Sequence, residues 1–338
     1  MHILFYDPLT PWAYSKKIFQ KQSLGGTEAT VLRIAEGLAP YHAISITQAY
    51  RQEPLQEENI HYLPLEQAHG LTPDVVVLLR SHLHLLEVGK RYRNARLFFW
   101  IHNTPSNALF RHKRTLAQYH YQIIAVSHYQ RELAEKKLLG KWWQRLLKDK
   151  RLTDNIPVHI LYNPIADDLQ PDTTPWDKNK LLFLSSPHKG LAETLKLFQS
   201  ISYHYPEYQL YLTNPGYQKM TLPLTDKVHY LGSLPHAEVI QKLRESFCVF
   251  YPQYVNPETF GLIYAEANAV GTPVLAHDFG AAREVLSDAT QLIDGSNPRK
   301  ILQKITAWRE KRLVVRGKPE FRLQEVIKRW QALLSRVD

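Results

Sequence analysis

The stretch "FCVFYPQYVNPETFGLIYAEANAVGTPVLAH", residues 247–277, contains the repeating unit on which our prediction of the fold rests. Two short apolar runs, "FCVFYP" and "TPVLAH", flank a helix-like run, "GLIYAEANAV", that is closed by Gly271. A strand that is apolar on both faces and is followed by a helix is typical of a parallel sheet covered on both sides. We therefore read this stretch as a strand–helix–strand unit.

The same alternation occurs along the rest of the chain. In the first half the predicted strands are "HILFY", "AISITQ", "DVVVLLR", "RLFFWIH", "QIIAVS" and "VHILYN". In the second half they are "KLLFLSS", "YQLYLT", "VHYLG", "FCVFYP", "TPVLAH" and "TQLID". Helical patterns such as "GTEATVLRIAEGLA" and "HYQRELAEKKLL" fall between them. Each half therefore predicts a doubly wound α/β domain with a parallel sheet.

A segment rich in proline and aspartate, "NPIADDLQPDTTPWDKNK" at 163–180, has neither period and separates the halves. We predict an N-terminal Rossmann-like domain at 1–165, a C-terminal one at 166–320, and a final helix at 321–338. That helix could pack on either domain, so a return to the first domain is one of two open arrangements. Because such sheets bind ligands at the carboxyl ends of their strands, two in series predict an interdomain cleft.

Composition narrows the class of protein. The chain has 338 residues, of which 44% are hydrophobic and 22% charged, as in globular proteins. Its one cysteine, Cys248, excludes an internal disulfide and fits a reducing cytoplasm. We find neither signal-peptide regions nor an apolar run near the ~20 residues of a membrane span. The net charge of +10 suggests an acidic partner: nucleotide phosphates, anionic lipid or nucleic acid.

Two motifs could bind an anion at a helix start. Gly25 and Gly26 precede a helix, where glycine lets backbone amides approach a diphosphate closely. Taken alone, an ordinary loop capped by Thr27 explains this pair better. Lys189 follows the strand "KLLFLSS", where its charge could neutralise a phosphate, although a solvated lysine explains the position equally well. Neither motif is a Walker loop or the dinucleotide fingerprint GxGxxG.

Glu258 and Glu266 are separated by seven residues, the first in a loop and the second inside the following helix. A carboxylate can accept hydrogen bonds from two hydroxyls at once, which suits the vicinal diol of a ribose or hexose. A capping glutamate and a surface glutamate are the simpler explanation, and spacing alone does not decide between the two.

The order of the motifs resembles a known family. "GGTE" before a helix, "HKG" at the start of the second domain, and the Glu258–Glu266 spacing followed by "GTPVLA" resemble the retaining GT4 glycosyltransferases, or glycosyl transferases group 1. "AVSHYQREL" and "ILYNPI" are similar to that family's segments in the first domain. The resemblance implies the GT-B fold, in which two Rossmann-like domains face each other across a cleft.

The resemblance also implies roles for individual residues. Glu266 would hold the ribose hydroxyls of a nucleotide sugar, and Glu258 would contact the transferred sugar. The remaining implied positions are the amides of Phe260 and Gly261 near that sugar, Lys189 and Gly25-Gly26 at the diphosphate, and His102 facing the reacting centre. The implied activity is that of a hexosyltransferase that retains the anomeric configuration and needs no metal and no cofactor besides the nucleoside diphosphate sugar.

The chain departs from the family where many relatives carry an arginine before the lysine. Here "FLSSPHKG" has Ser185 and Ser186 in that region. Arg80 and Arg283 are the weak candidates to replace the arginine, and "DFGAAREVL" stands where Gly-Gly is frequent. These departures concern the donor and the turnover rather than the fold.

A basic segment, "KKLLGKWWQRLLKDKRL" at 136–152, has seven Lys or Arg residues and one acid, with Leu and Trp at helical spacing. Such a helix can lie on an anionic membrane surface, or its apolar stripe can pack on the first domain. The first arrangement predicts a cytoplasmic protein that is peripheral on the inner face of the membrane. Nucleic acid is disfavoured because no motif for it is visible.

The sequence analysis leads to one main reading and two alternatives. The main reading is transfer of a sugar to a glycan or lipid-linked acceptor. The alternatives are a sugar-nucleotide epimerase on the same fold and a non-catalytic protein that binds a nucleotide sugar or a membrane surface. Transfer to an added acceptor would separate the first from the others.

Overall fold

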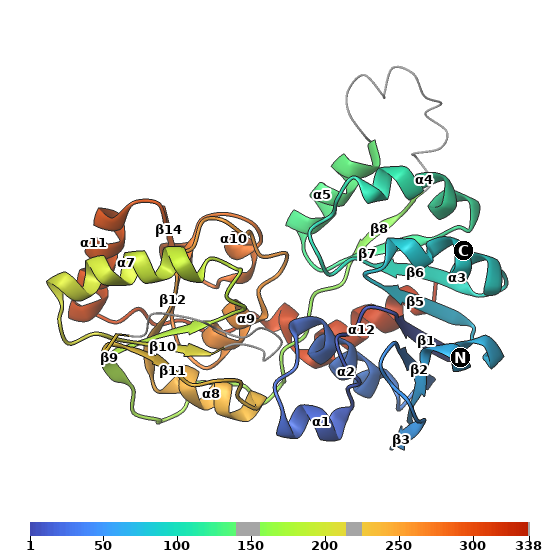
Figure 1. Cartoon of the computed structure of the whole chain (residues 1–338), viewed down its shortest axis with the longest axis horizontal. Helices are drawn as coiled ribbons and strands as arrows, with labels where there is room; N and C mark the ends of the chain where they lie inside the picture. Colours follow the sequence, from blue (N-terminus) through green and yellow to red (C-terminus); the bar gives the residue numbers. More distant parts are fainter. Residues whose placement is uncertain (140–155, 214–224, 337–338) are drawn as a thin grey trace. The chain divides into compact units, whose positions relative to one another are not determined.

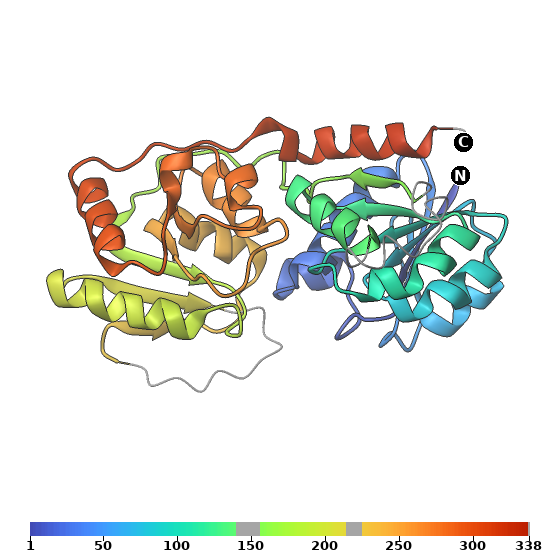
Figure 2. The same ribbon diagram turned by 90° about the horizontal axis from the view of Figure 1, so that it is seen from above.

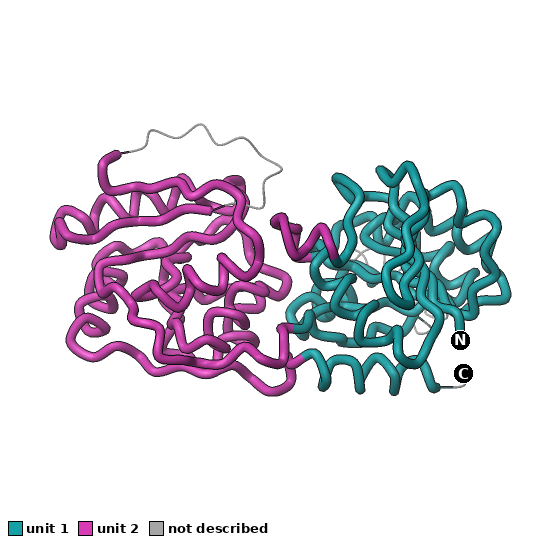
Figure 3. Tube along the Cα trace, turned by 90° about the horizontal axis from the view of Figure 1, so that it is seen from below, with its two compact units in different colours: residues 1–16, 27–164, 323–338 teal, residues 17–26, 165–322 magenta. Residues whose placement is uncertain are grey.

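The computed structural model describes residues 1–139, 156–213 and 225–336 and divides into two compact units. Unit 1 comprises residues 1–16, 27–164 and 323–338, and unit 2 comprises residues 17–26 and 165–322 (Figure 3). We describe each unit by itself.

Unit 1 is built on an eight-stranded sheet in the order β3-β4-β2-β1-β5-β6-β7-β8 (Figure 1). The strands are β1 (His2–Asp7), β2 (Ala43–Gln48), β3 (Leu55–Glu57), β4 (Ile60–Pro64), β5 (Val75–Leu79), β6 (Arg96–Trp100), β7 (Gln122–Ala125) and β8 (Val158–Ile160). Every pair is parallel except β3–β4. Only the β3–β4 edge was not predicted, because its two short strands mix polar and apolar residues and form no apolar run.

Helices cover both faces of this sheet. They are α2 (Gly26–Leu38), α3 (Leu85–Arg91), α4 (Ala108–Gln118), α5 (His128–Leu139) and α12 (Leu323–Leu334), with 3₁₀ turns η1 (Leu65–Gly70) and η2 (His82–His84). Alternate residues of β1 point to opposite faces. Leu4 and Tyr6 join the core formed with α3, α4 and α5, whereas Phe5 packs beneath Trp330 of α12.

The C-terminal helix α12 is part of the unit 1 core. The Trp330 ring lies 4.9 Å from the ring of Trp100 and 6.1 Å from that of Phe5, measured between centroids. Arg96 at the start of β6 donates hydrogen bonds to the last carbonyls of the helix, those of Leu333 and Leu334. Figure 2 shows the helix lying along this unit. Its apolar stripe therefore packs on the first half of the chain.

Unit 2 contains a six-stranded, fully parallel sheet in the order β11-β10-β9-β12-β13-β14. The strands are β9 (Asp177–Leu184), β10 (Gln209–Thr213), β11 (Val228–Tyr230), β12 (Ser246–Tyr251), β13 (Val274–His277) and β14 (Leu292–Ile293). The helices are α1 (Lys16–Lys21), α7 (Leu191–His204), α8 (His236–Arg244), α9 (Leu262–Ala269), α10 (Ala282–Val285) and α11 (Pro298–Glu310), with η4 (Ala289–Gln291) and η5 (Pro319–Phe321). β9 begins inside the segment predicted to be a linker, because its first residues are polar and exposed.

Each sheet reverses its strand order at one point. In unit 1 the reversal lies between β1 and β5, and in unit 2 it lies between β9 and β12. Ligands of doubly wound sheets bind outside the carboxyl ends of the strands at such a switch point. The prediction of two doubly wound parallel α/β units is confirmed, and the two switch points are the places to look for a site.

Candidate functional site

Two loops meet at the switch point of unit 2. Lys189 follows β9, and Glu258 lies between β12 and α9. The Lys189 Nζ lies 3.0 and 2.9 Å from the two carboxylate oxygens of Glu258. The lysine side chain is 38% exposed, whereas that of the glutamate is only 11% exposed. The cation therefore keeps access to solvent while its carboxylate partner is largely enclosed.

The two loops are tied together by side chains that bond to backbone. Gly190 has a left-handed backbone, with φ of 83°, and a Cβ there would lie 2.4 Å from the Cβ of Gln253. Gln253 is fully buried and accepts hydrogen bonds from the amides of Val255 and Asn256, both at 3.0 Å. The side-chain Nδ2 of Asn256 in turn donates to the carbonyl of His188 at 2.8 Å. Glycine at 190 thus lets the second loop approach the first.

A third loop fixes the backbone of Glu258. Ala281 donates its amide hydrogen to the Glu258 carbonyl at 3.0 Å. The preceding Gly280 has φ of 61°, and a Cβ there would lie 2.7 Å from the same carbonyl oxygen. The glycine in "DFGAAREVL" is therefore needed for close approach to the glutamate.

Tyr251, the last residue of β12, contacts the same carboxylate. Its hydroxyl donates to Glu258 Oε1 at 2.9 Å, and its oxygen lies 3.3 Å from Ser185 Oγ. Burial, followed by the negative charge of Glu258, raises the pKa of Tyr251 well above its usual value. The hydroxyl therefore stays protonated and remains a donor. Sequence reasoning missed this residue, because a tyrosine ending an apolar strand resembles an ordinary core residue.

The helix α9 carries the second predicted carboxylate. Glu266 is buried, and its Oε1 lies 2.8 Å from Nε2 of His236, the first residue of α8. The His236 ring lies 5.4 Å from the Phe19 ring, centroid to centroid. The sequence did not indicate His236 as a partner of Glu266, since thirty residues separate them.

Phe260 and Gly261 lead into α9. The Phe260 ring is buried and packs edge-on against Phe321 at 5.1 Å between centroids. Gly261 has φ of 85°, and a Cβ there would lie 2.6 Å from the Tyr264 ring. The structure thus explains the glycine by backbone conformation and the phenylalanine by core packing.

Gly26 begins α2 and is counted with unit 2, unlike the rest of that helix. Its φ is outside the left-handed range, and a Cβ there would lie 3.4 Å from Leu262 Cδ1, an ordinary contact distance. Gly25 beside it is buried. Neither backbone conformation nor crowding by neighbouring atoms requires glycine at position 26.

His102 lies in unit 1, two residues beyond β6. The residue is 6% exposed, and its ring lies 4.3 Å from that of Trp100. Burial, followed by the charge of Arg80, lowers the pKa of His102 well below its usual value, so the imidazole is neutral. Gln130 fixes the surrounding loop by donating to the carbonyls of Ile101 and Asn103.

Arg80 lies at the unit 1 switch point and is committed to two carboxylates. Its guanidinium donates to Asp7 at 2.8 Å and to Glu28 at 2.9 Å. The three side chains are 11%, 0% and 3% exposed, respectively. Burial alone would lower the pKa of Arg80, but the two carboxylates outweigh burial and raise it. Arg80 is therefore a poor candidate for a phosphate contact, and Arg283 pairs instead with Asp278 at the surface.

Unit 2 brings most of the predicted residues to one edge of its sheet. Lys189 contacts Glu258 directly. Phe260 and Gly261 precede α9, and Glu266 lies within that helix. Gly26 lies against the first residue of that helix. His102 belongs to unit 1.

Two further predictions concern metals and membranes. In residues 1–139, 156–213 and 225–336, no three His, Cys, Asp or Glu side chains cluster as a metal site would require. No helix in those same ranges has the length and apolarity needed to cross a bilayer. Most of the basic segment 136–152, from residue 140 onward, lies outside the described residues.

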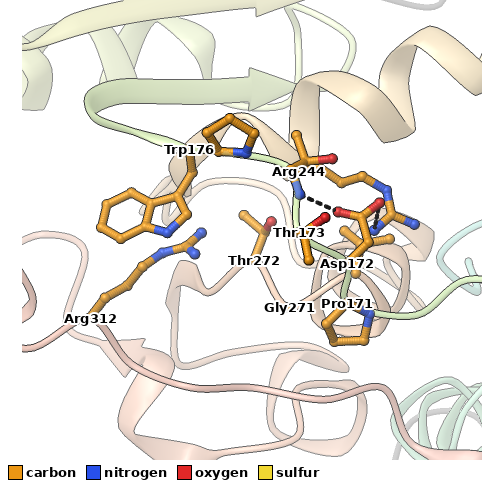
Figure 4. A pocket seen from close by; sticks show the side chains of 11 residues that line it. Pro171, Asp172, Thr173, Trp176, Arg244, Gly271, Thr272 and Arg312 are labelled. Atoms are coloured by element: carbon orange, nitrogen blue, oxygen red, sulfur yellow. Dashed lines mark hydrogen bonds and ion pairs between the residues drawn. The ribbon is translucent and has the colours of Figure 1, made fainter.

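Unit 2 also has a pocket of about 490 Å³ at the opposite edge of its sheet (Figure 4). Trp176, Arg244 and Thr272 line it just before β9, β12 and β13, at the amino ends of the strands. Its cations are engaged: Arg244 pairs with Asp172 at 2.8 Å, and the Arg312 guanidinium lies 4.2 Å from the centre of the Trp176 ring. The pocket therefore differs from the switch-point site in position and in the availability of its charges.

Comparison with known proteins gives matches of three kinds. Residues 168–322 match the family described as "Glycosyl transferases group 1". The chain is 26% identical over 197 residues to "Phosphatidyl-myo-inositol mannosyltransferase" of Mycolicibacterium smegmatis, covering 56% of this chain and 49% of that protein. It is 29% identical over 126 residues to "GDP-mannose-dependent monoacylated alpha-(1-6)-phosphatidylinositol monomannoside mannosyltransferase" of Corynebacterium glutamicum, covering 34% and 33%. The chain thus spans half or less of the length of these curated relatives.

Among solved structures, the chain is similar to "WaaG, a glycosyltransferase involved in lipopolysaccharide biosynthesis". The TM-score is 0.63 with 12% identity, and the similarity covers 99% of this chain and 100% of that one. At this identity the likeness establishes the fold, which is GT-B.

Proposed function

We propose, from the match of residues 168–322 to the family described as "Glycosyl transferases group 1", that the protein transfers a hexose from a nucleoside diphosphate sugar to a glycan or lipid-linked acceptor. The transfer retains the anomeric configuration. The observation that carries the proposal is the Lys189–Glu258 pair at the switch point of unit 2, within the residues that match the family.

The proposed role of Lys189 is to stabilise the departing diphosphate. The charge of Lys189 is balanced by Glu258, and the 38% exposure of the lysine side chain leaves it accessible to a ligand. A diphosphate offers more negative charge than one carboxylate and would draw the ammonium group toward it. Positive charge aimed at a leaving group lowers the barrier to sugar departure. With Lys189 and the amides of Gly25 and Gly26 in this role, the proposal requires no metal ion.

Glu258 and Glu266 supply acceptors for hydroxyl groups. Glu266 is buried in α9 and would accept hydrogen bonds from the ribose, and Glu258 would accept them from the transferred sugar. His102 would face the sugar as a neutral imidazole, consistent with the lowered pKa of this residue. The departing phosphate itself can take the proton of the acceptor hydroxyl, so no protein base is assigned.

The proposal for the acceptor and the location rests on the names of two curated relatives. The names of the two curated relatives specify phosphatidylinositol-based acceptors, and one specifies GDP-mannose as its donor. A lipid acceptor would place the protein at a membrane surface, which the basic segment 136–152 would approach from the cytoplasmic side. GDP-mannose and a phosphatidylinositol lipid are therefore the first donor and acceptor to test.

The first test is thermal unfolding with GDP, GDP-mannose, UDP and UDP-glucose. A nucleotide at ~100 times its Kd should add ~2.7 kcal/mol to the free energy of unfolding. Lys189→Met should weaken the binding of that nucleotide by about tenfold to a hundredfold, the value of a charge-assisted hydrogen bond. The control is Lys196→Met, which removes an exposed lysine from α7, the helix that follows Lys189.

The second test is turnover with radiolabelled donor and vesicles containing phosphatidylinositol or extracted glycolipid. Labelled lipid with unchanged anomeric configuration is the expected product. An epimerase would convert the donor sugar without any acceptor, and a non-catalytic protein would bind a nucleotide without turnover. Absence of binding to all four nucleotides by the wild-type protein would contradict the proposal.

A further inference from the structure

The Lys189–Glu258 pair poses a problem for donor binding. The Nζ of Lys189 contacts both oxygens of the carboxylate, so a diphosphate that draws the ammonium group toward itself would weaken at least one of these contacts. Glu258, whose side chain is 11% exposed, is then held less firmly by its cation. Its orientation depends on the hydrogen-bond donors that remain.

A second hydrogen-bond donor to Glu258 does not belong to the loop that carries Lys189. The Tyr251 hydroxyl lies 2.9 Å from Oε1 and comes from β12, so it moves with the sheet and not with the loop of Lys189. Ser185 Oγ, from the residue after β9, lies 3.3 Å from the same hydroxyl and gives it a second polar neighbour. The hydroxyl thus lies between Glu258 and a residue at the end of the neighbouring strand.

The ring of Tyr251 has a separate, structural task. It packs against Phe183 at 5.4 Å and Tyr264 at 5.9 Å, measured between ring centroids. A phenylalanine at position 251 would keep both contacts and would lose only the hydroxyl. This separation makes the role of the hydroxyl testable.

We propose that Tyr251 is a positioning residue, whose hydroxyl keeps the Glu258 carboxylate aimed at the transferred sugar while Lys189 exchanges that carboxylate for the donor diphosphate. The inference rests on the proposed function. It predicts that the hydroxyl matters to the sugar part of the donor and not to the nucleotide part. A nucleoside diphosphate engages Lys189 and has no sugar for Glu258 to contact.

The experiment compares Tyr251→Phe with wild type in two binding titrations, one with a nucleoside diphosphate and one with its sugar nucleotide. The pairs are GDP with GDP-mannose and UDP with UDP-glucose, whichever binds the wild type. We expect the Kd of the diphosphate to change by less than about twofold. The Kd of the sugar nucleotide should rise about tenfold, the loss expected for one hydrogen bond to a charged group, and kcat should fall.

Tyr264→Phe is the matched control. Tyr264 is a neighbouring buried tyrosine whose ring packs against Tyr251. The substitution therefore removes a hydroxyl from the same region. It should leave the ratio of the two Kd values unchanged. If Tyr251→Phe fails to fold, Ser185→Ala tests the same inference, with a shift of the ratio in the same direction by about two- to threefold.

Three outcomes decide the matter. A wild-type ratio in Tyr251→Phe, with donor binding intact, overturns this inference and leaves the proposed function standing. An equal loss for diphosphate and sugar nucleotide also overturns it, because the hydroxyl would then act on the whole site. Failure of the wild-type protein to bind any of these ligands overturns the proposed function, and this inference with it.

Discussion

The two switch points of this chain hold similar charged groups in different surroundings. In unit 1, Arg80 donates to Asp7 and Glu28, and all three side chains are nearly inaccessible. In unit 2, Lys189 pairs with Glu258, and the lysine is 38% exposed. Arg80 pairs with two carboxylates, Asp7 and Glu28, whereas Lys189 pairs with one, Glu258. In each cluster a tyrosine hydroxyl also donates to a carboxylate, from Tyr14 to Asp7 and from Tyr251 to Glu258.

Burial and partner number, rather than the presence of a cation at a strand end, distinguish the two clusters. Both carboxylates of the Arg80 cluster pair with the arginine, so exchanging one of them for a ligand would leave a buried carboxylate without this cation. The Lys189 cluster can lose one contact to solvent or ligand at small cost. We therefore expect the first cluster to contribute to stability and the second to ligand binding.

Removing each cation in turn is the test with the largest expected effect. Arg80→Met should lower the free energy of unfolding by about 3–5 kcal/mol, because it leaves two buried carboxylates unpaired. Lys189→Met should lower it by about 1 kcal/mol or less, since its ammonium group is screened by solvent. Denaturant unfolding of both variants measures the difference. Equal losses of unfolding free energy would show that the two clusters contribute equally to stability.

The glycines of the two motifs proposed to bind the diphosphate allow a second contrast. Gly190→Ala should cost about 2–4 kcal/mol, because alanine is strained at φ of 83° and its Cβ would overlap Gln253. Gly26→Ala should change stability by no more than about 0.5 kcal/mol, since a Cβ fits there. Nucleotide binding measured on Gly26→Ala should nevertheless weaken, because the added methyl group would hinder a diphosphate.

A result in which Gly26→Ala binds nucleotide as tightly as wild type would remove Gly25 and Gly26 from the proposed site. It would leave Lys189 as the main phosphate contact. The Gly190→Ala variant serves as the control for loop distortion, since its loss of binding should accompany a loss of stability.

The strands could be predicted because a parallel sheet covered on both faces requires continuous apolar runs. The β3–β4 edge could not be predicted, because an edge strand with one face toward solvent mixes polar and apolar residues and needs no continuous apolar run. Lys189 and Glu258 could be placed near each other, since both follow strands whose carboxyl ends share one sheet edge. Their direct contact depends on Gly190 and Gln253, whose fit is a matter of side-chain volume and not of pattern.

The contacts of Tyr251 and Arg80 could not be predicted from the sequence. Tyr251 carries its polar group at the end of an apolar strand, so the pattern conceals the hydroxyl. Arg80 occupies the right strand end for a phosphate contact, but its partners Asp7 and Glu28 lie 73 and 52 residues away in the chain. Only the folded sheet brings these carboxylates to the arginine.

The enclosure of the unit 1 switch point should also appear in the pH dependence of stability. Burial and Arg80 lower the pKa of His102 in the folded protein, whereas the unfolded chain takes up this proton near the ordinary pKa of about 6.5. Below that pH the unfolded state binds the proton that the folded state excludes, so stability falls as pH falls. Between pH 7.5 and 5.5 the loss from this residue is about 1.4 kcal/mol if the folded state takes up none.

Urea unfolding of wild type and His102→Gln at these two pH values isolates that contribution. His2, His42 and His112 also have lowered pKa values, but their contributions occur in both proteins and cancel in the difference. The variant should lose less stability on acidification than wild type, whereas Lys196→Met should match wild type. An identical loss in His102→Gln would mean that His102 accepts a proton in the folded protein, and that the unit 1 switch point is as open to solvent as that of unit 2.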